Sequence, residues 1–337
     1  MTADGKPANS RALRTRLAAR PGGPANSRAL RTRLAARPGG PAFPPSLGVA
    51  VAVLSVSFAA PLFRLAEAPA LTASFWRLAF ATLILLPFAG RAIPAWRDYS
   101  GREWALTILS GVALGLHFAL WVTSLFYTSV AASTCLVTLQ AVFVALGGHF
   151  VLKDRLGRAA VLGILVAVAG AAVIAFTDNA TAPQPDKALV GDALALTGGI
   201  ASAFYFLVGR KVRATRGLIA YVVPVYAVAA VTLFAALPLV GQPVGTGLPA
   251  SSFVAFVLLA AVPMLGGHTV ANWVVKHLPA HTVATWILLE PVGAALLAWP
   301  LLDEVPHLGV VAGGALVLAG AALTVPRRKA APAAVVA

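Results

Sequence analysis

The sequence predicts an all-α integral membrane protein whose ten transmembrane helices form two inverted five-helix repeats. Three observations predict this fold: the composition, a regular succession of apolar stretches, and a similarity between the two halves of the chain. Of the 337 residues, 59% are hydrophobic and only 11% are charged, whereas about a quarter of an average soluble domain is charged. Such a chain has too little polar surface to cover a water-soluble protein, so most of it is expected to lie in a lipid bilayer.

The first 43 residues form a basic segment that differs from the rest of the chain. The sequence PANSRALRTRLAARPGG occurs at 7–23 and again, without a change, at 24–40. Residues 1–43 contain Lys6 and eight Arg against the single acid Asp4, and they have few large apolar side chains. This composition predicts a disordered cytoplasmic tail that can touch anionic lipid. An organellar transit peptide is the alternative interpretation.

From residue 46 onward, apolar stretches of about 20 residues alternate with short polar breaks, and each can cross roughly 30 Å of hydrocarbon as a helix. The expected spans are about 46–65, 70–89, 104–126, 129–151, 157–177, 190–209, 218–240, 251–275, 280–301 and 307–326. The polar, proline-bearing gap at 178–189 predicts an extracytoplasmic linker between a first repeat, 46–177, and a second repeat, 190–326. Residues 327–337 are then a cytoplasmic C-terminal tail.

The two halves resemble each other when the first is shifted by 150 residues. The run AGAA at 169–172 then falls on AGAA at 319–322, and Gln140 falls on Glu290. With a shift of one further residue, His117 falls on His268. Because each repeat has an odd number of spans, the second is expected to enter the membrane from the opposite side.

The distribution of charge agrees with inverted repeats. The break after the fourth span, LKDRLGR, is basic, whereas the equivalent break after the ninth, LLDEVPHL, has no Lys or Arg. If the N-terminus is cytoplasmic, 23 of the 26 Lys and Arg fall on the cytoplasmic side and only Lys187 lies outside. This asymmetry predicts a multi-pass cell-membrane protein with both termini in the cytoplasm. The net charge of +15 therefore gives no support to nucleic-acid binding.

The sequence contains no pattern that indicates catalysis, a cofactor or a metal. The single cysteine, Cys135, excludes an intrachain disulfide and a cysteine-based zinc site, and it is expected to be a buried core thiol. There is no phosphate-binding glycine loop, and the six His do not have the spacing of metal ligands. The longest break has about 14 residues and no acidic or histidine cluster, so a membrane enzyme or a scaffold is only a remote alternative.

An ordered set of motifs resembles the EamA-type carriers of the drug/metabolite transporter superfamily. The closest match is WILLEPVGAALLAWPLLDEVPHLGVVAGGALVLAG at 286–320, with a Glu-Pro pair, a turn ending in Glu, and a glycine-rich last helix. The segments at 117–140, 206–213 and 266–280 also look like this family. The resemblance covers about residues 46–326 and implies ten spans that carry small molecules.

The chain departs from the family pattern in its first repeat. Ala141 stands where the family often has proline, so we expect the kink in the fourth span to be missing or weaker. Lys153-Asp154 replaces the usual Gly-Glu, and the first span lacks a common tryptophan.

Glu290 is the only acid expected near the middle of a span. A charge at the bilayer centre costs about 3 kcal/mol on insertion scales, so such a residue usually faces a cavity or a partner. Adjacent Pro291 removes a backbone donor and is expected to kink the helix. Glu290 is therefore a candidate for binding a cationic group or for carrying a coupling proton. A structural carboxyl that anchors helices is the alternative.

Three further polar residues are candidates because they are related by the repeat. Gln140, the equivalent of Glu290, either forms a polar wall of a cavity or makes an interhelical hydrogen bond. His117 and His268 can shuttle protons at physiological pH, or simply pack with a hydrogen bond.

The remaining candidates are aromatic, amide and basic side chains. Trp121 or Trp273 can stack on a substrate or only pack, and Asn272 lies on the same helix face as His268. Arg77 can bind a substrate carboxylate, but snorkelling to the interface or pairing with Glu67 is the favoured interpretation. Tyr205, Tyr221 and Tyr226 are possible cavity residues whose orientation the sequence does not give.

The resemblance and these residues together predict a secondary transporter that exports a small organic metabolite by alternating access, with proton coupling as an option. Efflux of cationic drugs through Glu290 is the alternative within this class. The expected partners are a small-molecule substrate and the bilayer. Because one chain holds both halves of the pathway, either a monomer or a homodimer is compatible with the sequence.

Overall fold

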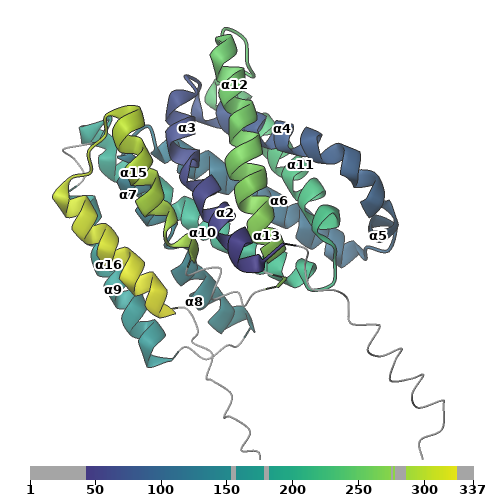
Figure 1. Ribbon diagram of the computed structural model, residues 1–337, viewed down its shortest axis with the longest axis horizontal. Helices are drawn as coiled ribbons and strands as arrows, with labels where there is room; N and C mark the ends of the chain where they lie inside the picture. The colour runs from purple at the N-terminus through teal and green to yellow at the C-terminus, as the bar shows by residue number, and fades with distance from the viewer. Residues whose placement is uncertain (1–42, 153–156, 178–181, 275, 278–285, 325–337) are drawn as a thin grey trace, which may run out of the picture. The chain divides into compact units, whose positions relative to one another are not determined.

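The computed structural model describes residues 43–152, 157–177, 182–274, 276–277 and 286–324 (Figure 1). The chain divides into two units, Met1–Pro44 and Pro45–Ala337, and all the helices described below belong to the second. The predicted N-terminal tail lies almost entirely outside the described residues, and the predicted C-terminal tail lies wholly outside them.

Every regular element in the described part of the chain is a helix, which confirms the predicted fold class. The first half contains α2 (Pro45–Ser57), α3 (Ala59–Leu65), α4 (Ala70–Ala89), η1 (Gly90–Ala92), α5 (Ile93–Arg97), α6 (Gly101–Ser124), α7 (Val130–Val137), α8 (Gln140–Leu152) and α9 (Arg158–Thr177). The second half contains η3 (Pro185–Lys187), α10 (Ala188–Arg213), α11 (Leu218–Ala236), η4 (Pro238–Val240), α12 (Ala250–Leu259), the π-helix η5 (Ala260–Thr269), α13 (Val270–Val274), α15 (Glu290–Leu302) and α16 (Leu308–Thr324).

These helices account for the ten predicted spans. Within the described residues, six helical stretches are long and apolar enough to cross a membrane, and four shorter apolar helices occupy the places of the fourth, fifth, ninth and tenth spans. Large apolar side chains such as Leu165, Val231 and Leu296 are more than 60% exposed. In a bilayer, lipid tails cover such side chains at no cost, because the tails are as apolar as leucine.

The helices pack in a pattern that is preserved when the two halves are exchanged. Helix α6, the third span, packs on α10, the sixth span, and correspondingly η5 in the eighth span packs on α2 in the first span. Likewise α7 and α8 pack on α10, while α15 packs on α2 and α3. The equivalent helices α4 and α11 contact each other, as do α9 and α16, which lie side by side in Figure 1. The packing therefore has an approximate two-fold relation between the halves.

The contact between α9 and α16 shows this relation at the level of single residues. A Cβ on Gly170 would lie 2.6 Å from the Gly313 carbonyl oxygen and 2.7 Å from the Val317 nitrogen. A Cβ on Gly320 would likewise meet Gly163 and Ala167, the residues 150 positions before Gly313 and Val317. Only glycine allows the two backbones to approach this closely.

The fourth and ninth spans are both interrupted, and the first of these breaks corrects our expectation. Helix α7 ends at Val137 and α8 begins at Gln140, although no proline is present there. The Thr138 hydroxyl donates to the Cys135 carbonyl oxygen, and Leu139 N donates to Leu136 O, three residues back. Such side-chain and i→i+3 bonds disturb the α-helical ladder, which explains a break without proline.

The ninth span is interrupted at the equivalent position. Pro291 lies at the N-terminal end of α15, which begins at Glu290, rather than inside a continuous kinked helix. Proline is favoured in the first turn of a helix because its missing N–H has no partner there in any case. Gln140 and Glu290 therefore each begin a half-helix.

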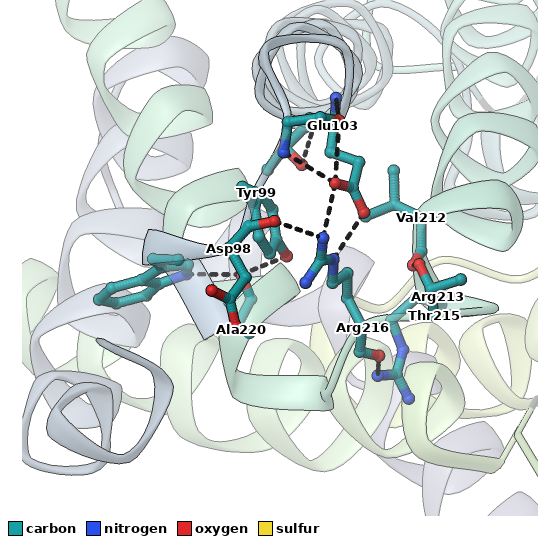
Figure 2. A network of polar contacts seen from close by, with 11 residues as sticks. Asp98, Tyr99, Glu103, Val212, Arg213, Thr215, Arg216 and Ala220 are labelled. Atoms are coloured by element: carbon teal, nitrogen blue, oxygen red, sulfur yellow. Dashed lines mark hydrogen bonds and ion pairs between the residues drawn. The ribbon is translucent and has the colours of Figure 1, made fainter. Parts of the chain in front are cut away.

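A polar network joins the two halves where α5 and α6 meet the segment between α10 and α11 (Figure 2). Arg216 donates to both carboxylate oxygens of Glu103, at 2.6 Å each, and to the Asp98 carbonyl oxygen at 2.9 Å. The pKa of Arg216 is raised, chiefly by its hydrogen bond to Glu103. Glu103 also completes a capping box with Ser100 at the start of α6, so one carboxylate both caps a helix and joins the halves.

A second network joins the halves near the end of α3. The Arg64 guanidinium donates to the Leu125 carbonyl oxygen at 2.8 Å and pairs with Glu304 at 3.6 Å. Glu304 also accepts the Val130 N–H at the start of α7. The predicted topology places this network on the outer side of the membrane and the Arg216 network on the cytoplasmic side.

Candidate functional site

A cavity lies between the two halves of the chain. Its walls come from α2, α3, α6, α7 and α8 of the first half and from α10, η5, α13 and α15 of the second. The apolar lining residues are Ala52, Val56, Ala59, Val137, Phe206, Ala271 and Ile287. The polar lining residues are His117, Trp121, Gln140, Ser202, His268 and Glu290. A mostly apolar cavity with a few converging polar groups is typical of a small-molecule site.

Gln140 and Glu290 enter the cavity from equivalent places, the first residues of α8 and α15. The first N–H groups of α8 bond to the carbonyl oxygens of Thr138 and Leu139, and the Gly293 N–H of α15 bonds to that of Leu289. Discontinuous helices of this kind form binding sites near the bilayer midplane in several transporter folds. The structure thus brings together the two residues that the sequence relates by the repeat.

Gln140 has a partner that the sequence did not suggest. The Ser202 hydroxyl of α10 donates to the Gln140 Oε1 atom. Ser202 lies one helical turn after Gly198. A Cβ on Gly198 would lie 3.1 Å from Trp121 N, so this glycine lets α10 approach α6 closely. The glycine pair at 198–199 could have indicated a close helix crossing, but it gives no hint of which residue the serine contacts.

His117 is held in one tautomer. Its Nδ1 atom lies 3.0 Å from the Gly198 carbonyl oxygen. Since a carbonyl oxygen only accepts, Nδ1 carries the proton and Nε2 is the atom of a neutral ring that can accept one. The ring is stacked on Trp121, with the centroids 5.8 Å apart and an angle of 6° between the planes.

Trp121 has an unused hydrogen-bond donor. Its side chain is 2% exposed and lines the cavity, and its Nε1–H has no partner among the described residues. Its ring packs edge-on against Phe63 at 6.0 Å. A buried N–H without a partner is costly, so a group that fills the cavity and accepts this hydrogen bond would gain binding energy.

His268 reaches the cavity from η5, a π-helix that contains Pro263. π-helical segments are rare and often occur at functional sites. Asn272, one turn later, donates to the His268 carbonyl oxygen and to the Tyr205 hydroxyl, both at 2.8 Å. Asn272 is 6% exposed and does not line the cavity, so its role is to fix the backbone of His268 through these hydrogen bonds.

Several expected residues lie elsewhere. Trp273 packs against Gly48 and His277 and does not line the cavity, so its predicted stacking on a substrate finds no support here. Tyr205, Tyr221 and Tyr226 are at most 1% exposed and belong to the hydrophobic core between the helices.

Arg77 corrects our favoured interpretation. It is 0% exposed, so it does not snorkel to the interface, and it belongs to neither of the two ion pairs found among the described residues. Its guanidinium carbon lies 4.3 Å from the Phe118 ring centre and 5.4 Å from that of Phe63. Proximity to Glu67 in sequence suggested a surface pair, but the α4 helix turns Arg77 into the protein.

The comparisons with known proteins agree with this fold. The model of the EamA-like transporter family matches residues 45–176 and 189–325. A solved structure described only as "Crystal structure of protein" has a TM-score of 0.59 and 18% identity over 83% of this chain and 95% of its own, which shows a shared fold. A search of curated proteins found no match. Since the family model covers most of the chain in two copies, this protein belongs to the EamA-like transporter family.

Proposed function

We propose that the protein is a secondary active transporter that exports a small organic metabolite across the cytoplasmic membrane by alternating access. One observation carries this proposal: a single cavity receives polar side chains from both repeats, at the first residues of two half-helices. When two repeats share one site, rocking of one against the other can open it to either side in turn. The family supports transport in general, and export rests on the resemblance alone.

Glu290 is the proposed proton carrier. It is the only carboxylate among the residues that line the cavity. Its charge interacts with that of Arg77. In a low-dielectric site the ionised and neutral forms of a carboxyl group differ strongly in energy, so substrate binding and protonation influence each other. The buried positive charge of Arg77 opposes the entry of a cation, which favours metabolite export over efflux of cationic drugs.

The orientation remains that expected from the sequence, with both termini in the cytoplasm. The loop that carries Arg216 is assigned to the cytoplasmic side because its basic residues follow the charge rule.

The test compares metabolites inside and outside cells that carry the wild-type chain, Glu290→Gln, or no copy. We expect one metabolite to accumulate outside only with the wild type. In inverted vesicles, a pH gradient should then drive uptake of that metabolite, and Glu290→Gln should reduce the rate at least about 100-fold, because it removes the proton site. Asp186→Asn, at an exposed acid in η3, is the matched control. Equal transport by Glu290→Gln and wild type would exclude Glu290 as the proton carrier.

A further inference from the structure

Arg77 is a buried cation whose hydrogen-bonding groups are unused. All three of its side-chain nitrogens lack a partner within the described residues, and the side chain is 0% exposed. A buried charge that is not paired costs several kcal/mol, and a native structure that keeps one needs a reason for it. The contacts with the Phe63 and Phe118 rings compensate only part of this cost.

Phe118 packs against both Arg77 and the side chains of the cavity wall. Phe118, whose ring centre is 4.3 Å from the guanidinium carbon, also contacts three side chains that line the cavity. Its centroid lies 4.8 Å from that of His117, 5.6 Å from His268 and 6.3 Å from Trp121. Phe118 thus contacts the guanidinium of Arg77 on one side and three cavity-lining side chains on the other.

The charge of Arg77 influences the cavity, but no ion pair with a cavity residue neutralises it. Glu290 interacts with it electrostatically, yet the two side chains do not form an ion pair. The walls supplied by Val56, Phe206 and Ile287 are apolar. A ligand that suits this arrangement has an apolar body for these walls and an anionic group for the guanidinium.

We propose that Arg77 is the anchor for a carboxylate of the transported molecule, and that the ring of Phe118 covers this anchor when the cavity is empty. This inference rests on the proposed function, since it names the substrate class of the same cavity. The planar guanidinium offers two parallel N–H groups that match a carboxylate, a geometry that lysine does not provide.

The test uses three probes of nearly equal shape: isovalerate, isovaleramide and isoamylammonium. Thermal unfolding of the purified full chain in detergent is measured with each probe over a range of concentrations. We expect isovalerate to raise the Tm of the wild type, with an apparent affinity at least about 10-fold higher than that of the amide, because charged hydrogen bonds contribute more. The ammonium probe should bind most weakly.

Four variants locate the interaction. Arg77→Gln should abolish the preference for isovalerate, and Arg77→Lys should weaken isovalerate binding by about 10-fold because the fork is lost. Glu290→Gln should keep or tighten isovalerate binding. Arg97→Gln, at an exposed arginine, is the control. If Arg77→Gln does not fold, the order of the three probes on the wild type and the effect of Arg77→Lys still decide.

Equal or stronger binding of the amide or the ammonium probe to the wild type would overturn the proposal. Isovalerate binding that survives Arg77→Gln or is unchanged in Arg77→Lys would do so as well. These measurements need no transport. If isovalerate binds through Arg77 but vesicles move no metabolite, the proposed function fails and this inference stands. If vesicles move only uncharged or cationic metabolites, the proposed function stands and this inference fails.

Discussion

At the scale of single residues, a substitution of Trp121 can distinguish a contribution to substrate binding from a contribution to stability. Its indole N–H points to no acceptor in the described part of the chain, although the ring packs on His117 and Phe63. Trp121→Phe keeps an aromatic ring but removes the indole donor together with part of the fused ring. We expect the KM for the transported metabolite to rise about 3- to 10-fold, the value of one hydrogen bond, while the free energy of unfolding falls by about 1 kcal/mol.

The control for this substitution is Trp299→Phe, at a side chain that is 57% exposed. It should change neither KM nor stability. Transport kinetics in vesicles and thermal unfolding of the same preparations provide both values. A variant Trp121→Phe with reduced stability and an unchanged KM would show that the indole N–H does not contact the substrate.

The sequence predicts which residues line the cavity better than it predicts which residues pack around them. Gln140, Glu290, His117 and His268 could be found because the repeat pairs them, and all four line the cavity. Arg77 was misjudged because its environment consists of Phe63 and Phe118, which are far from it in sequence and belong to other helices. No local sequence pattern shows which helix faces pack together, so the sequence does not predict whether a side chain on a given face is buried.

At the scale of elements, the start of α15 should matter for transport more than for stability. Pro291 occupies the first turn of α15 and prevents a regular helix from continuing through Glu290. Pro291→Ala allows the helix to extend backwards, which turns Glu290 away from its present position. We expect transport to fall more than about 10-fold, while the free energy of unfolding changes by less than about 1 kcal/mol.

Pro300, the second proline of α15, is the matched control because it is exposed. Pro300→Ala should leave transport close to the wild-type rate in the same vesicle measurement. If both substitutions reduced transport equally, straightening of α15 as a whole would be responsible instead of the position of Glu290.

Helical spans follow from hydropathy, whereas interruptions within them do not. The ten apolar stretches were predictable because each has the length and composition that a bilayer demands. The break before Gln140 was missed because the chain has no proline there. Threonine hydroxyls also bond to backbone carbonyls inside unbroken helices, as those of Thr107 and Thr123 do, so a threonine alone does not signal a break.

At the scale of the whole molecule, the charge rule predicts an orientation that reporter fusions can check. A fusion after Gln184, in the segment between the repeats, should report the outer side, and a fusion after Lys329 should report the cytoplasm. An alkaline phosphatase reporter and a fluorescent-protein reporter give complementary signals at each site. The same side at both positions would be incompatible with an odd number of spans in the second repeat.

The approximate two-fold relation gives a sharper prediction. Equivalent substitutions in the two halves should lower the free energy of unfolding by equal amounts. Gly170 and Gly320 are related by the shift of 150 residues, and each faces the other helix at backbone contact distance. Gly170→Leu and Gly320→Leu should each force α9 and α16 apart and lower the free energy of unfolding by about 3 kcal/mol, the upper part of the range for overpacking. Ala172→Leu and Ala322→Leu are the equivalent controls at exposed positions of the same helices, and both should be close to neutral.

Thermal and denaturant unfolding in detergent measure all four variants. A large cost for one glycine and a small cost for the other would show that the two-fold relation does not extend to the energetics of this contact.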